Sequence, residues 1–248
     1  MEHPPSLWKR SAAELIGTAL LVLIGPGTAA FLGILTAKSN QAATLADIGV
    51  VSLAFGLIVA AMIYTFGKVS GCHINPAVTV ALASVGRFSW QEVPAYIAAQ
   101  LVGGVVGALG IVAVLGSDGA VIGNLGATVL SADTSYIRGM VIEAIEAYVL
   151  MLVIMGVAVD QRAPAGFAGL IIGLTVAGII MMTAGPTGSS FNPARTFGPY
   201  VIDSLMGGKV YWSQFPIYLI GPLAGAILAA LSYDKIAFSR RRDHSLQQ

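Results

Sequence analysis

The sequence predicts an all-α membrane protein: six transmembrane helices plus two re-entrant half-helices, arranged as an inverted repeat. The first observation is composition, because mean hydropathy is +0.82 and only 10% of the 248 residues are charged, whereas soluble domains carry about 25% charge. The second is that apolar segments long enough to span a bilayer recur six times. The third is an Asn-Pro-Ala motif that occurs once in each half of the chain.

The same composition argues against several classes of function. The net charge of +1 offers no basic surface for nucleic acid. Cys72 is the single cysteine, which excludes an intrachain disulfide framework and a multi-cysteine metal site. Lys9 and Arg10 precede an apolar run of more than 20 residues, too long for the core of a signal peptide, and no cleavage site stands out. We therefore expect the first span to be retained.

The predicted spans follow from length, since a transmembrane helix needs about 20 apolar residues. Six segments qualify: 8–35, 46–67, 91–115, 137–159, 165–185 and 212–233. Two apolar pieces remain, near 75–85 and 192–203. Each covers about 10 residues, or about 15 Å as a helix, which is half of the hydrocarbon thickness. Neither piece can cross the membrane alone.

Basic residues predict the orientation of the spans. On one side of the six-span pattern lie Lys9, Arg10, Lys68, Arg87, Arg162, Lys235, Arg240, Arg241 and Arg242. On the other side lie Lys38, Arg138 and Lys209. The richer side should be cytoplasmic, and both termini should then lie in the cytoplasm.

An internal repeat relates the two halves. An offset of 117 residues superposes 55–79 on 172–196, with ten of the 25 positions identical. Each half holds three spans, an odd number, so the halves should lie in opposite membrane orientations with the functional site between them at the midplane. We expect one channel domain over 1–248, with repeat halves at about 8–115 and 137–233 and a cytoplasmic tail at 236–248.

The two Asn-Pro-Ala motifs predict the starts of the half-helices. Asparagine is a preferred N-cap and proline a preferred first helical residue, so half-helices should begin at Pro76 and Pro193. A single such motif is usually an ordinary turn or cap, but two copies in matching register favour a shared centre. Two facing N-termini, each of roughly +0.5 charge, would disfavour cations and protons there. The side-chain amides of Asn75 and Asn192 would then be donors to a small neutral guest.

These stretches carry a family resemblance. "GCHINPAVT" and "GSSFNPARTFGPY" resemble the aquaporin (major intrinsic protein) family, and most resemble its archaeal M-type members. The similarity runs from "AAELIGTALLVLIGPG" to "IYLIGPLAGAILAAL". It implies an aquaporin-like right-handed bundle in the cell membrane that passively conducts water and small neutral solutes and excludes protons and ions. It also implies a homotetramer with one pore per subunit and no cofactor, and it makes Ala77 and Ala194 part of the pore centre.

The resemblance further implies a selectivity filter of Phe55, Ile180, Ser189 and Arg195. Arg195 has support of its own, because it is the one basic residue that the span pattern places at membrane depth, where charge is costly. The alternative is an arginine paired structurally with an acid. Strict water channels of the family usually have histidine where Ile180 stands, and glycerol facilitators usually have aspartate where Thr196 stands.

We therefore expect fast water passage and slower glycerol passage. A glycerol or dissolved-gas facilitator is an alternative, and a secondary transporter, which also uses inverted repeats and broken helices, is a less favoured one. The sequence shows no nucleophile, base and orienting residue in a recognisable set, so we do not expect an enzyme.

Five further residues have predicted roles. The resemblance implies that Glu14 and Glu143 accept N–H bonds from the re-entrant loops and that His73 braces one loop, although buried acids can also simply join helices. Cys72 is the repeat mate of Ser189, so it should be a pore-lining thiol unless it is an inert buried one. Glu146 stands where the family usually has glycine. Since two inward carboxylates one turn apart repel, it should be protonated or point to a subunit interface.

Overall fold

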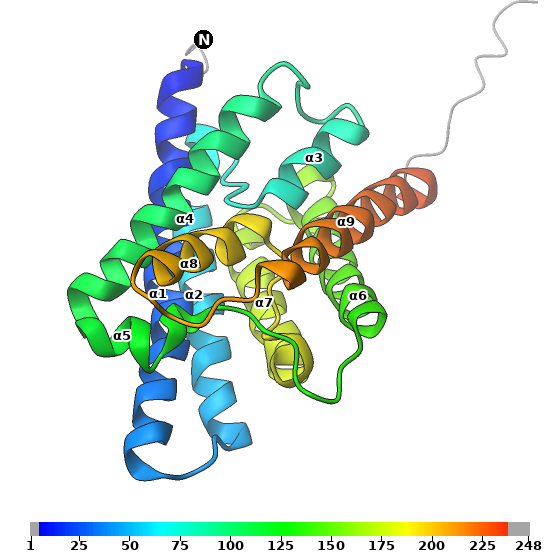
Figure 1. Cartoon of the computed structure of the whole chain (residues 1–248). Coiled ribbons are helices and arrows are strands. Elements are labelled where there is room, and N and C mark those ends of the chain that lie inside the picture. The colour runs from blue at the N-terminus through cyan, green and yellow to red at the C-terminus, as the bar shows by residue number, and fades with distance from the viewer. Residues whose placement is uncertain (1–4, 238–248) are drawn as a thin grey trace, which may run out of the picture.

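The computed structural model describes residues 5–237, and helices make up most of that range (Figure 1). All six predicted spans are present. They are α1 (Leu7–Ser39), α2 (Leu45–Ser70), α4 (Val93–Leu115), α6 (Tyr136–Ile154), α7 (Ala168–Thr187) and α9 (Phe215–Ala237). A π-helical turn, η2 (Met155–Val159), extends α6, and a 3₁₀ turn, η3 (Trp212–Gln214), precedes α9. All six are long and apolar enough to cross a membrane.

The two half-helices begin where the sequence predicts. α3 (Pro76–Ser84) and α8 (Pro193–Leu205) each have proline in the first helical position. Asn75 caps α3 by accepting a hydrogen bond from the Ala77 N–H at 2.9 Å, and Asn192 caps α8 by accepting one from the Ala194 N–H at 3.0 Å. At 9 residues, α3 is about 14 Å long and does not cross the bilayer.

Some boundaries differ from the prediction. α1 continues through Pro26 to Ser39, where Asn40 ends it in the left-handed region at φ 52°. α9 extends to Ala237, past the predicted end of the last span at 233, and the residues of the predicted tail beyond it, with Arg240, Arg241 and Arg242, lie outside the described residues. The connection after α4 holds two short elements that the sequence analysis missed, α5 (Ser117–Val121) and η1 (Asn124–Gly126).

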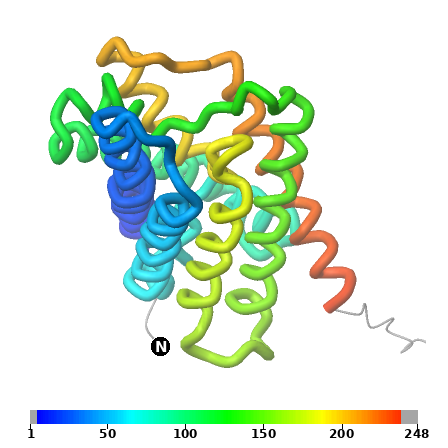
Figure 2. Tube along the Cα trace, turned by 90° about the horizontal axis from the view of Figure 1, so that it is seen from below, coloured from blue at the N-terminus to red at the C-terminus, as the bar shows by residue number. Residues whose placement is uncertain are grey.

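Each half packs its first span against its third, α1 against α4 and α6 against α9, and α2 packs against α7 between the halves. Figure 2 shows the blue-to-cyan helices of the first half beside the green-to-red helices of the second. At the α2–α7 crossing, a Cβ on Gly56 would lie 2.5 Å from the Gly173 carbonyl oxygen, and a Cβ on Gly173 would strike the Gly56 carbonyl. Only glycine allows these helices to approach so closely.

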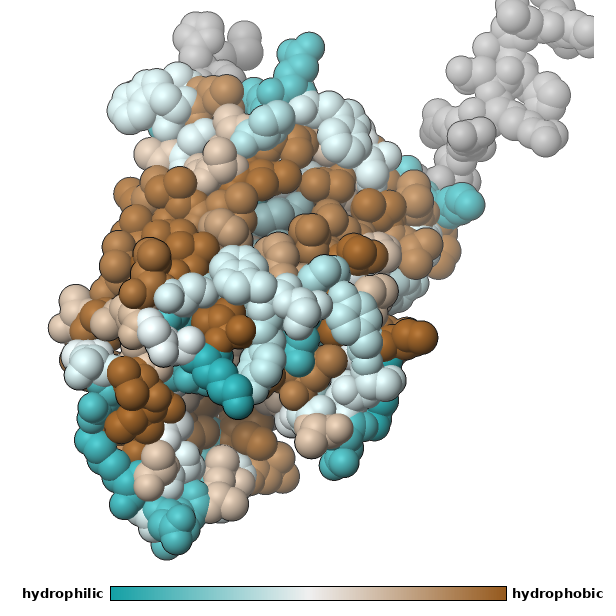
Figure 3. Space-filling model, in the orientation of Figure 1, coloured by the Kyte–Doolittle hydropathy of each residue, from teal (hydrophilic) through white to brown (hydrophobic). Residues whose placement is uncertain are grey.

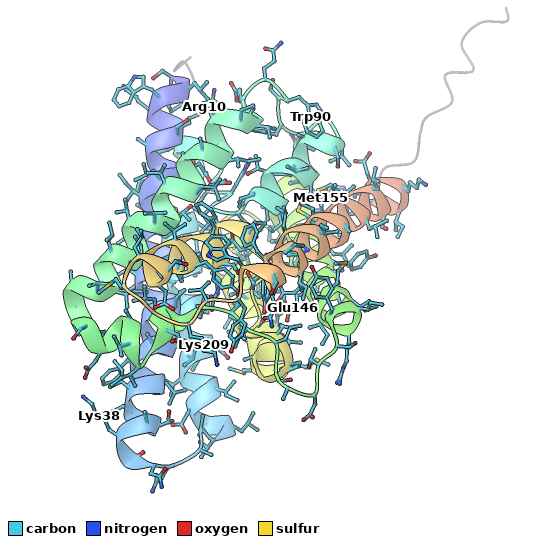
Figure 4. The ribbon with its side chains drawn as sticks, viewed as in Figure 1. Arg10, Lys38, Trp90, Glu146, Met155 and Lys209 are labelled. Atoms are coloured by element: carbon cyan, nitrogen blue, oxygen red, sulfur yellow. The ribbon has the colours of Figure 1, made fainter. Side chains whose placement is uncertain are left out.

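The molecule has polar ends and an apolar waist. In Figure 3 hydrophobic residues cover the surface over α1 and α4, and hydrophilic residues gather above and below them. Figure 4 shows Arg10 at one end and Lys38 and Lys209 toward the other. Ion pairs join residues predicted to share a side, Arg87 with Asp234 at 3.0 Å and Lys38 with Asp118 at 2.8 Å. Which end faces the cytoplasm stays a prediction.

Candidate functional site

The two re-entrant loops meet inside the bundle, just before α3 and α8. Their backbones share an unusual conformation, with positive φ at Cys72 (49°) and Ile74 (43°) in one loop and at Ser189 (47°) and Phe191 (37°) in the other. Such φ values cost non-glycine residues about 1–3 kcal/mol each, and they persist only where the surroundings hold them.

Two buried glutamates hold these strained loops. Glu14 accepts hydrogen bonds from the backbone N–H groups of His73 (2.9 Å) and Ile74 (2.6 Å). Glu143 accepts the equivalent bonds from Ser190 (3.0 Å) and Phe191 (2.7 Å). Both glutamates are 0% exposed. The bonds expected from the family resemblance are therefore present, and they turn the loop N–H groups away from the loops' open side.

The asparagine amides cross from one loop to the other. Asn75 Nδ2 donates to the Phe191 carbonyl at 2.9 Å, and Asn192 Nδ2 donates to the Ile74 carbonyl at 2.8 Å. From the sequence, both amides were predicted to point into the gap between the half-helices. Because an NH₂ group has two hydrogens, the structure uses one of each pair to join the loops and leaves the other for a guest.

A cavity of about 360 Å³ reaches this centre from the predicted cytoplasmic side. Asn75, Asn192 and Arg87 are among the residues that line it. Its remaining wall is largely apolar, with Val59, Val78, Leu82, Leu150, Ile154 and Val176 among the lining residues. Few polar groups would therefore compete with the two asparagines for a guest.

A second cavity, of about 300 Å³, lies on the far side of Arg195. Arg195 lines both cavities, Phe55 lines the first and Ile180 the second. The Arg195 guanidinium carbon lies 5.2 Å from the centroid of the Phe55 ring, within cation–π range, and its Nη1 donates to the Gly126 carbonyl at 2.9 Å. Arg195 therefore lies on the wall of both cavities and contacts Phe55 in the first, while Ile180 lines the second with it.

Arg195 has no acidic partner among the ion pairs of residues 5–237. This contradicts the alternative of a structural pair with an acid. Its Gly126 partner is the last residue of η1, which the sequence did not predict. A glycine carbonyl carries no side-chain signal, so the sequence held no clue to this contact.

Ser189 and Cys72 occupy different settings although they are repeat mates. Cys72 is 5% exposed and lines the first cavity. Ser189 is 1% exposed and is absent from the lining of the two cavities described above. Its hydroxyl lies 3.0 Å from the Thr183 hydroxyl on α7. If Ser189 shapes the passage, it does so through its backbone.

His73 contacts residues of α3, of α4 and of the loop between them. Its Nδ1 lies 3.1 Å from the Thr79 hydroxyl, and its ring packs against Phe88 and Tyr96 at centroid distances of 4.9 and 5.2 Å. Gln100, which the sequence analysis missed, donates through Nε2 to Glu14 (2.9 Å) and to Thr79 (3.0 Å). Its position among apolar residues of α4 was the only sequence signal.

Glu146 is 1% exposed and lies inside the bundle (Figure 4), which contradicts the alternative that it points to a subunit interface. Within residues 5–237, no three His, Cys, Asp or Glu side chains come together as a metal site requires.

The geometry suits a narrow passage better than a reaction centre. It combines two facing helix N-termini, one fixed guanidinium and paired amide donors. Such a site attracts oxygen lone pairs and repels cations.

The comparisons with known proteins agree. A family model described as "Major intrinsic protein" matches residues 2–233. Aquaporin AqpM of Methanothermobacter marburgensis is 48% identical over 239 residues, covering 92% of this chain and 97% of that protein. Aquaporin NIP1-2 of rice (Oryza sativa subsp. japonica) is 36% identical over 231 residues, covering 92% of this chain and 71% of that protein. The solved aquaglyceroporin from Plasmodium falciparum superposes with a TM-score of 0.82 at 26% identity, covering 94% of this chain and 98% of the other.

Proposed function

The chain belongs to the major intrinsic protein family, and from that premise we propose how it works as a passive transmembrane channel for water and small neutral solutes. It is an integral, multi-pass membrane protein with six apolar spans. The observation that carries the proposal is the pair of asparagine caps, Asn75 and Asn192, on the wall of a cavity where two half-helices meet. Members of this family are channels, and we propose no catalytic residue.

We propose that the centre excludes protons and cations electrostatically. The N-termini of α3 and α8 each contribute about half a positive charge, and both face the same short stretch of the passage. A guest that accepts from Asn75 and Asn192 has its lone pairs occupied. It is then a poor link in a chain of proton-conducting hydrogen bonds.

We propose that Phe55, Ile180, Ser189 and Arg195 form the filter. The contact between Phe55 and Arg195 supports this, as does the position of Arg195 between the two cavities. Ile180 is 2% exposed and apolar, so one wall of the filter offers no hydrogen bond. Water, which is small, should pass fast, and glycerol should pass more slowly.

A glycerol or dissolved-gas facilitator remains the second candidate, favoured by the aliphatic Ile180 in the filter. A coupled transporter is disfavoured, because Glu143 already accepts two backbone hydrogen bonds and its neighbour Glu146 is buried away from both cavities.

We also propose one channel domain over the whole chain, both termini in the cytoplasm, residence in the plasma membrane, and assembly into a homotetramer. The basic residues at the Arg10 end support the orientation. Large apolar side chains exposed along the spans, such as Leu57 at 65% and Met182 at 84%, support burial against lipid or neighbouring subunits. Chemical crosslinking in native membranes should trap species up to four chains.

The test is stopped-flow light scattering of proteoliposomes containing the whole chain. We expect water permeability well above that of protein-free vesicles, glycerol permeability lower than water, and no proton flux reported by an entrapped pH dye. Fluxes should not saturate and should not change with ionophores. Water permeability equal to that of empty vesicles would refute the channel proposal, and glycerol matching water would refute the order of solutes.

A further inference from the structure

The carboxyl group of Glu146 is buried without a hydrogen-bond partner of normal geometry. The residue is 1% exposed, and both carboxyl oxygens are unpaired within the described part of the chain. The groups that the carboxyl faces are the hydroxyls of Thr183 and Ser189 and the carboxyl of Glu143. Leaving a buried carboxyl unpaired is costly. The residues around Glu146 should therefore show why a carboxyl group occupies this buried position.

The other half of the repeat shows what Glu146 replaces. Glu146 lies three residues after Glu143 as Gly17 lies three residues after Glu14, so Gly17 is its counterpart. A Cβ on Gly17 would lie only 2.7 Å from the Ile74 side chain and 3.8 Å from the ring of Phe66. By the 117-residue offset, the counterpart of Phe66 is Thr183. A large and a small residue have therefore changed places between the halves. The space could have been filled by any side chain of similar size, so volume does not explain the carboxyl group.

The hydrogens on the neighbouring hydroxyls are already committed. Thr183 donates its hydroxyl hydrogen to the Ile179 carbonyl at 2.7 Å. The hydroxyl of Ser189, 3.0 Å from that of Thr183, must then be the donor of their mutual bond. Both oxygens thus present only lone pairs toward Glu146. An ionised carboxylate would face these lone pairs with no hydrogen to accept.

Glu143 also disfavours an ionised carboxylate at Glu146. It accepts two backbone N–H bonds, as an ionised carboxylate does. Glu146 lies three residues further along α6, on the same face of the helix. A second negative charge at that distance in an apolar interior is strongly disfavoured. The neutral acid, which has one hydrogen to donate, satisfies both constraints.

We propose that Glu146 is a positioning residue of the filter, a neutral carboxylic acid that donates to Ser189. The resulting chain of hydrogen bonds runs from Glu146 through Ser189 and Thr183 to the Ile179 carbonyl. It ties the strained backbone of Ser189, at φ 47°, to the turn of α7 that carries Ile180. The Ser189 loop and the Ile180 turn of α7 are thereby held at a set distance from each other. Discrimination between solutes depends on that distance. The proposal rests on the channel function proposed above.

The equivalent residues of the first half support this view. There Gly17, Phe66 and Cys72 take the places of Glu146, Thr183 and Ser189, and Cys72 is the only one of these three with a polar hydrogen. The filter arginine likewise occurs in one half alone, because the counterpart of Arg195 is Val78. The polar residues Glu146, Thr183 and Ser189 thus belong to the same half as Arg195. A device that adjusts the filter would be needed only there.

The experiment compares Glu146→Leu, which keeps the volume and removes the donor, with Glu146→Gln, which keeps a neutral donor. The readout is the ratio of glycerol to water permeability in proteoliposomes. We expect Glu146→Leu to raise the ratio about fivefold, the effect of one buried hydrogen bond, while Glu146→Gln keeps the wild-type ratio. Ile145→Leu, at a neighbouring position that is 57% exposed on the outer face, is the matched control.

The outcomes separate the two proposals. Wild-type protein without water flux would refute the channel function itself. A wild-type ratio in Glu146→Leu would show that the residue only fills space. A changed ratio in Glu146→Gln would show that its charge matters, and either result overturns the inference. If the Glu146→Leu protein does not accumulate, Thr183→Val tests the same proposal. It removes the acceptor of the Ser189 hydrogen bond and should also raise the ratio of glycerol to water permeability. An unchanged ratio in Thr183→Val would refute the chain of hydrogen bonds.

Discussion

Asn75 and Asn192 are joined reciprocally, since each side-chain amide donates to the carbonyl of the residue that precedes the other. The two bonds measure 2.9 and 2.8 Å and link residues 116 and 118 positions apart in the chain. Each asparagine oxygen also caps its own half-helix. One residue in each half therefore orients its helix and attaches it to the other half.

Replacing either asparagine should destabilise the protein to a similar extent. Asn75→Ala and Asn192→Ala each lose an N-cap, worth about 0.5–2 kcal/mol, and a buried cross-loop bond, worth about 1 kcal/mol. We expect comparable falls in the melting temperature in detergent, together with reduced water flux. Asn40→Gly is the control, because Asn40 is exposed and glycine tolerates its φ of 52°. A large difference between the two asparagine variants would contradict their symmetric roles.

Ile180→His should lower glycerol permeability more than water permeability. Histidine is larger and polar, so it narrows the filter beside Arg195 and replaces its apolar wall. Paired swelling assays with water and glycerol measure the change. Met181→Leu, at an adjacent position that is 39% exposed on the outer surface, should leave both fluxes unchanged. An unaltered glycerol flux in Ile180→His would argue against the filter assignment.

Arg195→Val should open the passage to glycerol and allow protons through, while water flux is retained. The substitution installs the residue of its repeat counterpart, Val78, and removes both the positive charge and the contact with Phe55. An entrapped pH-sensitive dye reports the proton leak. Lys38→Ala, which removes an exposed cation at the predicted outer end, controls for charge alone. A proton-tight Arg195→Val channel would place the barrier entirely at the asparagine centre.

Mercurial reagents should block the channel through Cys72. The thiol lines the cavity of about 360 Å³ next to Asn75, so an attached mercury atom would obstruct the path of solutes. We expect block that is reversed by added thiol, and none in Cys72→Ser. Because the described chain has no other cysteine, persistent block of Cys72→Ser would contradict a pore-lining position.

Asp160, just beyond α6, should stabilise the predicted cytoplasmic end in a pH-dependent way. Its carboxyl accepts from Arg162 Nε at 2.9 Å and from the Tyr233 hydroxyl at 2.9 Å. Hydrogen bonding to Arg162 holds the pKa of Asp160 well below its usual range. A depressed pKa in the folded state means that the stabilisation is present above the unfolded pKa of about 3.9 and is lost as pH falls below it.

Asp160→Asn should therefore lower the melting temperature at neutral pH, and the gap to wild type should narrow below about pH 4. Thermal unfolding in detergent across a pH series measures this. Asp133→Asn, at an exposed position in the loop before α6, should show no such gap. A gap that stays constant down to acidic pH would mean that the carboxylate charge is not the source of the stability.

The secondary-structure elements of this protein follow from its amino-acid sequence alone. The lengths of its apolar runs specify six spans, because the bilayer sets the length of a helix that crosses it. Asn75–Pro76 and Asn192–Pro193 specify two helix starts, because capping depends on adjacent residues. The repeat specified that the halves oppose each other. Segment length, capping residues and an internal repeat are all visible along the chain. They do not depend on which side chains contact each other in the fold.

The partners of the buried polar groups, by contrast, are set by the packing of the helices. That Gln100 joins Glu14 to Thr79, that Arg195 reaches the Gly126 carbonyl, and that Glu146 faces Ser189 all depend on how each helix is rotated in the bundle. The apolar helices carry little amphipathic pattern to reveal that rotation, since lipid and protein interior are almost equally apolar. Close packing at glycines and hydrogen bonds between distant residues set it instead, and these exist only once the chain has folded.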